Sequence, residues 1–171
     1  MDTTQVTNMI ELAKFLPDSV REELFRPTGE ALGLPGNLYG DGFFDGLHRA
    51  EQVSRDIKHA LEMTTSDGLI ILHDCNPPHH ELAREKYDSD GVAGSAWNGT
   101  TWKATWEFFF SGSRELKVVD SDRGVGIIDK SKPKDPQVLR NPFFEFDEFA
   151  ATKHEVGYLL RWEATQAWLA S

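Results

Sequence analysis

Two short runs, FFDGLH at residues 43–48 and LIILHDCNP at residues 69–77, decide how this chain folds. Each is an apolar stretch that ends at an acidic residue, Asp45 in the first run and Asp74 in the second, with a histidine close by. Residues 48–63, which join them, carry apolar side chains at helical spacing. The pattern predicts a strand, a helix and a second strand. Because ligands bind outside the carboxyl ends of parallel strands, two carboxylates and two imidazoles are expected to converge on one crevice.

The rest of the chain adds helices and strands to this unit. The second strand is apolar at every position, as expected when helices bury both of its faces. A further helix is expected to begin after Asn98 or Thr100, since either side chain can cap it. Residues 115–119 and 125–128 read as two antiparallel strands joined by a turn, and residues 147–169 as a last amphipathic helix. We therefore predict an α/β fold with an antiparallel strand pair at one edge.

The chain has 171 residues, which is long enough for one domain with its own core. The expected elements divide it into three segments. Residues 1–42 form a helical and glycine-rich segment, whose glycine density indicates a loop or a junction. Residues 43–130 form the α/β segment. Residues 131–171 hold a Pro/Lys-rich linker and the C-terminal helix.

The composition restricts the classes of partner. The net charge of −10 disfavours nucleic acid and anionic membrane surfaces, because both attract clustered Lys and Arg. No apolar stretch approaches the roughly 20 residues that span a bilayer, and the N-terminus lacks the basic start and apolar run of a signal peptide. Cys75 is the only cysteine, so no intrachain disulfide can form, and a packed residue is expected there rather than a nucleophile. These features favour a cytoplasmic enzyme or binding domain.

Several ordered motifs carry a resemblance to a known family. They are DGLH at residues 45–48, EQVSRD at 51–56, HDCNP at 73–77, WNGTTWK at 97–103 and GVGII at 124–128. In this order and spacing they resemble the class I S-adenosylmethionine-dependent methyltransferases, most closely the bacterial subgroup called methyltransferase family 24. The resemblance implies a Rossmann-like sheet, S-adenosylmethionine as cofactor and a small-molecule acceptor.

The first 42 residues depart from that family. Its members bind the cofactor with a Glu/Asp-x-Gly-x-x-x-Gly loop after the first strand, and a second acidic residue binds the ribose. Neither feature is present here, and a single strand–helix–strand crossover needs on the order of 30 residues. We therefore predict a methyltransferase sheet truncated at its N-terminal half, with the glycine-rich residues 33–42 as the junction. A different N-terminal arrangement is the alternative, and the cofactor-binding residues stay unknown.

The resemblance assigns a metal role to the two strand-end carboxylates. In metal-dependent O-methyltransferases of this fold, aspartates at the positions of Asp45 and Asp74 hold Mg²⁺, which binds the substrate oxygen and stabilises its deprotonated form. Asn76, just beyond the second strand, is a further candidate ligand. The alternative is structural, because an aspartate at such a position often caps the next helix or ties down a loop.

Acid–base and substrate roles fall on neighbouring residues. His48 and Asp45 are the candidate catalytic residues, because imidazole exchanges protons near neutral pH. His73 is a candidate substrate contact, and a buried histidine bonded to a carbonyl or to an aspartate is its structural alternative. The other candidate substrate contacts lie on the expected third helix and its approach, and they are Trp97, Trp102 and Lys103. Tryptophans at helical spacing are more often core residues than ligand contacts.

Two functions follow from these observations. The first is O-methyl transfer from S-adenosylmethionine to a small hydroxylated or sugar-like acceptor, with Mg²⁺ assistance and with His48 aiding deprotonation. The second is a truncated, inactive relative that acts as a binding or oligomerisation module, because half a sheet exposes a strand edge and favours a homo-oligomer. A metal-dependent hydrolase is a weaker third, since no nucleophile or carboxylate-rich cluster is recognisable.

Overall fold

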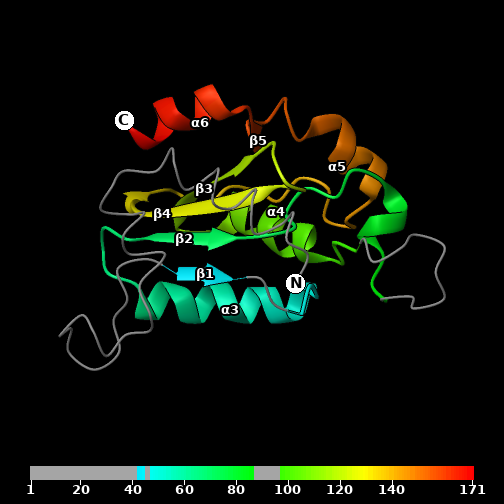
Figure 1. The fold of residues 1–171 in the computed structure, drawn as a ribbon, viewed down its shortest axis with the longest axis horizontal. Coiled ribbons are helices and arrows are strands. Elements are labelled where there is room, and N and C mark those ends of the chain that lie inside the picture. The colour runs from blue at the N-terminus through cyan, green and yellow to red at the C-terminus, as the bar shows by residue number, and fades with distance from the viewer. Residues whose placement is uncertain (1–41, 45–46, 87–96) are drawn as a thin grey trace.

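A computed structural model describes residues 42–44, 47–86 and 97–171 (Figure 1). Asp45 and the helical, glycine-rich segment expected before β1 lie outside the described residues. The described part has an α/β fold, built on a mixed sheet of five strands in the order β1-β2-β4-β3-β5. The α/β class predicted from the sequence is therefore confirmed.

The first unit of the fold is the predicted strand, helix and strand. β1 (Gly42–Phe44) pairs in parallel with β2 (Leu69–Leu72), and α3 (Ala50–Met63) connects them. The buried face of α3 is made of residues spaced three or four apart: Val53, Ile57 and Ala60. All four residues of β2 are buried, which explains why this strand is apolar throughout. The parallel pairing places the carboxyl ends of β1 and β2 at the same edge of the sheet.

The other strands extend the sheet beyond β2. β4 (Val125–Pro133) is antiparallel both to β2 and to β3 (Arg114–Val119), and it reaches into the predicted linker. β5 (Leu159–Leu160) pairs in parallel with β3 and forms the edge of the sheet. The antiparallel pair is therefore present, but its predicted place at the edge is wrong. A strand of two residues is too short to give a sequence pattern, and backbone hydrogen bonds to β3 define it.

The C-terminal region differs from the single helix predicted at residues 147–169. It contains two helices, α5 (Phe146–Thr152) and α6 (Trp162–Leu169), with β5 between them. Gly157, whose φ is 72°, turns the chain after α5 in a conformation that glycine adopts most easily. Tyr158 then becomes fully buried beside the sheet. In the sequence, Tyr158 falls at a position that continues the helical spacing of apolar residues. In the structure, its contacts are those of a residue at the edge of the sheet.

The core has two sides, because side chains alternate across the faces of a strand. Ile70 and Leu72 belong to the larger cluster, together with α3, α4 (Thr101–Ser111) and α5. The bulkiest buried members of this cluster are Trp102, Trp106, Phe149 and Tyr158. Leu69 and Ile71 belong to the smaller cluster, which α6 covers. In the described ranges, no helix has the length and apolar character that a membrane span requires.

Thr100, at the start of α4, also serves the start of α3. Its Oγ1 accepts a hydrogen bond of 2.8 Å from the Ala50 amide, and its own amide donates to the His48 carbonyl at 2.7 Å. The first-turn amides of a helix lack partners within that helix. The threonine hydroxyl therefore caps a helix that is distant along the sequence, and it fixes α3 to α4.

Thr100→Ala is expected to lower the free energy of unfolding by about 0.5–2 kcal/mol, the usual loss when a capping hydroxyl is removed. Thr100→Ser keeps the hydroxyl and is the matched control, expected to stay within about 0.5 kcal/mol of wild type. Urea denaturation followed by circular dichroism gives both values. Equal stability of the alanine and serine variants would show that the bond to Ala50 contributes nothing.

Candidate functional site

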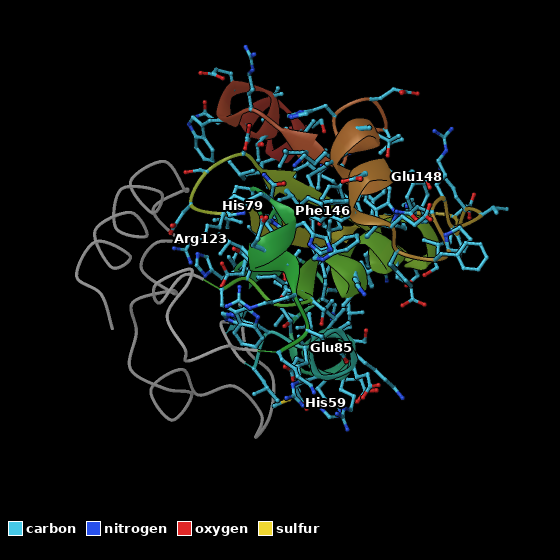
Figure 2. All side chains as sticks on the ribbon, turned by 90° about the vertical axis from the view of Figure 1, so that its right-hand side faces the viewer. His59, His79, Glu85, Arg123, Phe146 and Glu148 are labelled. Carbon is cyan, nitrogen blue, oxygen red and sulfur yellow. The ribbon has the colours of Figure 1, made fainter. Side chains whose placement is uncertain are left out.

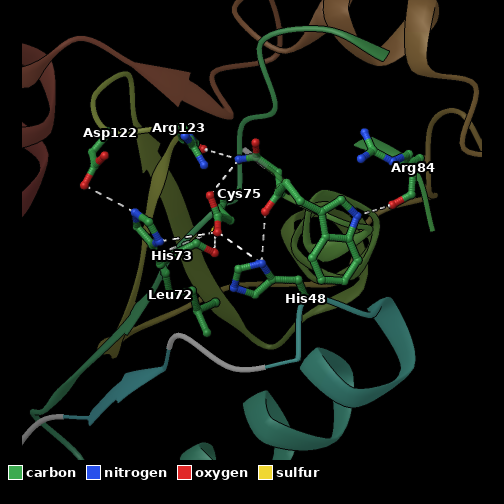
Figure 3. Close-up of polar contacts among 10 residues, drawn as sticks. His48, Leu72, His73, Cys75, Arg84, Asp122 and Arg123 are labelled. Carbon is green, nitrogen blue, oxygen red and sulfur yellow. Dashed lines mark hydrogen bonds and ion pairs between the residues drawn. The ribbon is translucent and has the colours of Figure 1, made fainter. Parts of the chain in front are cut away.

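Four segments meet beyond the carboxyl ends of β1 and β2 (Figure 3). They are residues 73–76 after β2, 47–49 before α3, 97–100 before α4, and the β3–β4 turn at 120–124. Backbone hydrogen bonds of 2.7–2.9 Å join the first segment to the turn and the second to the third. Figure 2 looks onto this end of the molecule, where the label of Arg123 marks the turn. The side chains that meet here form what we call the polar network: His48, His73, Asp74, Asn98 and Asp122.

Asp74 lies at the centre of the polar network, and its side chain is only 2% exposed. Its Oδ1 accepts a hydrogen bond of 2.8 Å from Asn98 Nδ2. Its Oδ2 lies 3.2 Å from His48 Nδ1 and 3.5 Å from His73 Nδ1. A buried carboxylate is costly without such partners, so these nitrogens offset the hydration that Asp74 has lost.

His48 has the geometry of an oriented base. Its Nδ1 donates to the Trp97 carbonyl at 3.2 Å and lies equally close to Asp74 Oδ2. Because both neighbours are acceptors, Nδ1 carries a proton, and Nε2 is the nitrogen that gains or loses one. The Trp97 ring lies 5.5 Å from the imidazole, and a hydrogen bond from Trp97 Nε1 to the Arg84 carbonyl fixes the indole. An aspartate behind the protonated nitrogen is the arrangement that orients a catalytic histidine.

His73 lies between two carboxylates, and its side chain is 3% exposed. Its Nδ1 is 3.5 Å from Asp74 Oδ2, and its Nε2 is 3.3 Å from Asp122 Oδ2 in the β3–β4 turn. Each ring nitrogen therefore faces a carboxylate oxygen at an ion-pair distance rather than in a hydrogen bond, and a neutral ring can direct its one proton to only one of them. This is the arrangement of the structural alternative, a buried histidine beside an aspartate, and a substrate contact by His73 stays a prediction.

The backbone of the site is strained. Six described residues other than glycine have positive φ, and four of them lie here: His48 at 54°, Asp74 at 60°, Asp122 at 43° and Arg123 at 61°. Such left-handed conformations cost roughly 1–2 kcal/mol per residue when nothing compensates for them. They persist only where surrounding contacts hold them, and they cluster at functional sites.

Asn76 links the site to α5. Its Nδ2 donates to Asp120 Oδ1 at 3.3 Å, and its Oδ1 accepts from Lys153 Nζ at 2.7 Å. Burial lowers the pKa of Lys153, and the nearby Asp120 carboxylate partly opposes that shift. The Lys153 ammonium therefore already binds the Asn76 oxygen that the sequence predicted as a metal ligand.

Sequence reasoning missed three site residues, Asn98, Asp122 and Lys153. Each comes from a loop or a helix end that is distant from β2 along the chain, so no local spacing connects it to Asp74. A signal exists for two of them: Asn98 lies within the WNGTTWK motif, and the run SDRG at residues 121–124 predicts the turn that holds Asp122.

The described residues do not fit the Mg²⁺ that the resemblance implies. Mg²⁺ prefers about six oxygen ligands, whereas both Asp74 oxygens have nitrogen neighbours and Asn76 Oδ1 accepts from Lys153. Within residues 42–44, 47–86 and 97–171, no group of three or more His, Cys, Asp or Glu side chains is arranged to hold a metal. Asp45 lies outside those ranges, so its metal and catalytic roles stay predictions.

The other candidate substrate contacts lie at different depths. Trp97 is partly exposed and packs against His48. Trp102 is 1% exposed, and its ring lies 4.6 Å from that of Phe149, so its surroundings are those of the aromatic core. Lys103 is half-buried, with Nζ 5.8 Å from the centroid of the Trp102 ring, which is within cation–π range. Of the three, Trp97 is the one that the described contacts place at the polar network.

Compared with known protein families, with curated proteins and with solved structures, the chain shows no match. The methyltransferase resemblance therefore rests on the sequence motifs. A function for this chain has to be argued from those motifs together with the geometry of the polar network.

Gly124 lets the β3–β4 turn approach the segment after β2. A Cβ at this position would lie 2.4 Å from the Asn76 amide nitrogen, and the φ of 91° disfavours any side chain. Gly124→Ala is therefore expected to lower the free energy of unfolding by about 2–3 kcal/mol, because overlap adds to backbone strain.

Gly157→Ala is the matched control for that variant. Its φ of 72° is also positive, but a Cβ there would make only an ordinary contact, 3.7 Å from Lys117 Nζ. This substitution is expected to lower the free energy of unfolding by about 1–2 kcal/mol, which is the cost of the left-handed backbone conformation alone. Urea denaturation measures both losses, and equal losses would contradict the close docking of the turn.

Cys75 is fully buried, and burial raises the pKa of its thiol from 9.0 to about 12. Because the thiolate is the reactive form, labelling of the folded protein by a chromogenic disulfide at about pH 8 is expected to be at least roughly 100-fold slower than labelling in urea. The measurement follows absorbance in buffer and in denaturant. Comparable rates in the two solutions would show that the end of β2 opens freely.

Proposed function

We propose that this chain is a class I S-adenosylmethionine-dependent methyltransferase that acts on a hydroxyl oxygen of a small hydroxylated or sugar-like acceptor. The observation that carries the proposal is the pair of His48 Nδ1 and Asp74 Oδ2, 3.2 Å apart at the carboxyl edge of two parallel strands. The ordered motifs within residues 43–130 are the second support. On this proposal the described sheet is the C-terminal part of a Rossmann-like methyltransferase sheet.

His48 is the general base of the proposed reaction. Its Nε2 takes the proton of the acceptor hydroxyl. S-adenosylmethionine, when bound, would supply the methyl group, with S-adenosylhomocysteine as the leaving product. Asp74 stays ionised, holds the proton on His48 Nδ1 and stabilises the positive charge that the ring gains. Asn98 binds the other oxygen of Asp74 at 2.8 Å, which fixes the orientation of the carboxylate. The Trp97 ring lies beside His48 and orients the acceptor by packing against it.

The cofactor needs residues beyond those described. The glycine loop and the ribose-binding acid of the family have no counterpart in the sequence before residue 43. Residues outside the described ranges or a second subunit would complete the cofactor site, and the second arrangement would make a homo-oligomer the active form. The net charge of −10 leaves a small molecule, rather than nucleic acid, as the proposed partner.

A binding or oligomerisation module without activity is the second candidate. Among the described strands, β1 has three residues and pairs on one side only, with β2. An edge strand of this kind offers backbone amides and carbonyls to another chain. A truncated methyltransferase relative would use that edge to join a partner, while the polar network would serve only to hold the fold.

The first experiment is isothermal titration of the purified chain with S-adenosylmethionine, followed by transfer of a radiolabelled methyl group to a panel of hydroxylated small molecules. Micromolar binding is expected. His48→Gln and Asp74→Asn are expected to keep cofactor affinity and to lower transfer by about 10²–10⁴-fold, the usual contribution of a general base. His79→Gln is the matched control, because His79 is exposed and pairs with Glu81 away from the polar network.

Absence of heat from a folded sample would reject the methyltransferase proposal. Sedimentation of the same sample would then test the second candidate, which expects a dimer or a larger assembly. A monomer at every protein concentration would reject the oligomerisation module as well.

A further inference from the structure

The β3–β4 turn has a backbone that is costly by itself. Three successive residues, Asp122, Arg123 and Gly124, have φ of 43°, 61° and 91°. Short turns between antiparallel strands commonly need one or two left-handed residues. Residues other than glycine avoid that conformation, so contacts outside the turn must offset its cost.

The turn docks on the segment that follows β2. The Asn76 amide donates to the Arg123 carbonyl at 2.7 Å, and the Cys75 amide donates to the Gly124 carbonyl at 2.9 Å. The Asn76 side chain adds a hydrogen bond to the turn. The two residues after Asp74 are therefore fixed by the turn.

The residue before Asp74 is fixed by the same turn. Asp122 Oδ2 lies 3.3 Å from His73 Nε2, and His73 Nδ1 lies 3.5 Å from Asp74 Oδ2 (Figure 3). The His73 ring thus bridges the carboxylate of the turn and the carboxylate beside His48. Held on both sides, Asp74 keeps its left-handed φ of 60° and keeps its carboxylate toward the candidate base.

We infer that Asp122 is a positioning residue: acting through His73 and Asp74, it keeps the proton of the candidate base on Nδ1. The inference deepens the proposed function and rests on it, since His48 is the base there. With Asp122 in place, His73 has a carboxylate oxygen near each ring nitrogen. A neutral His73 can then direct its one proton from Nε2 to the turn. Without that carboxylate the proton favours Nδ1, where His73 competes with His48 for Asp74 Oδ2, and the His48 Nδ1 proton is held less firmly.

The test reads the ring nitrogens directly and needs neither cofactor nor acceptor. Long-range ¹H–¹⁵N spectra of protein labelled with ¹⁵N-histidine, recorded at about pH 8.5 where an ordinary imidazole is neutral, show which nitrogen carries the proton. A His48→Gln variant assigns the His48 signals among those of the six histidines. The wild-type protein is expected to show His48 protonated on Nδ1.

Asp122→Asn is expected to shift His48 toward a mixture of the two tautomers, seen as its two ¹⁵N signals moving toward each other. Asp135→Asn, an equal change of charge at an exposed position, is the matched control and should leave the His48 signals unchanged. If Asp122→Asn does not fold, Asp122→Gly removes the same carboxylate, suits the positive φ of residue 122 and decides the question. Wild-type His48 signals in the variant that folds would overturn the inference.

Methyl transfer, once measured, gives a second readout. Asp122→Asn is then expected to lower kcat by about 10–100-fold with little change in KM, as a positioning residue one step removed from the reacting group does. Loss of kcat without any change in the His48 signals would also overturn the inference. If the chain binds no cofactor, the histidine spectra can still be recorded. The proposed function and the role of Asp122 can therefore be rejected independently.

Discussion

The described structure depends on one buried charge, the Asp74 carboxylate. An ionised carboxylate removed from water is costly unless donors and opposite charges replace its hydration. Its nitrogen neighbours come from three places in the chain: His48 before α3, His73 after β2 and Asn98 before α4. Pairing this one charge therefore fixes the relative positions of those segments, and His73 extends the same constraint to the β3–β4 turn through Asp122.

The same constraint explains where the chain needs glycine. A Cβ on Gly99 would lie 2.1 Å from the His48 carbonyl oxygen, and one on Gly124 would lie 2.4 Å from the Asn76 amide nitrogen. In both places two segments approach so closely that their backbones leave no room for a side chain. These glycines belong to the WNGTTWK and GVGII motifs, so part of the motif pattern reflects how the network packs rather than contact with a cofactor.

Local patterns encode the part of the fold that the sequence predicted. The apolar run of β2, the amphipathic face of α3 and the polar residues at their ends gave the parallel unit and brought His48, His73 and Asp74 together. Tertiary contacts decide the rest. Tyr158 fits a helical pattern, yet it is buried beside the sheet with its hydroxyl bonded to the Cys75 carbonyl at 3.0 Å. Asn98 and Asp122 reach Asp74 and His73 only because their loops dock there, and no spacing along the chain reports that docking.

The pairing of Asp74 also limits the chemistry of the network. Because its oxygens already face nitrogens, the described arrangement favours proton transfer over metal binding. Proton transfer needs one member within reach of a ligand, and the His48 side chain is 17% exposed against 2% for Asp74 and 3% for His73. On the proposed function, reaction is thereby confined to the edge of one imidazole beside Trp97, while the buried members orient that ring. Each described bond that orients Asp74 comes from residues 48–124, so the acid–base arrangement is built entirely from the sheet and the loops at its carboxyl edge.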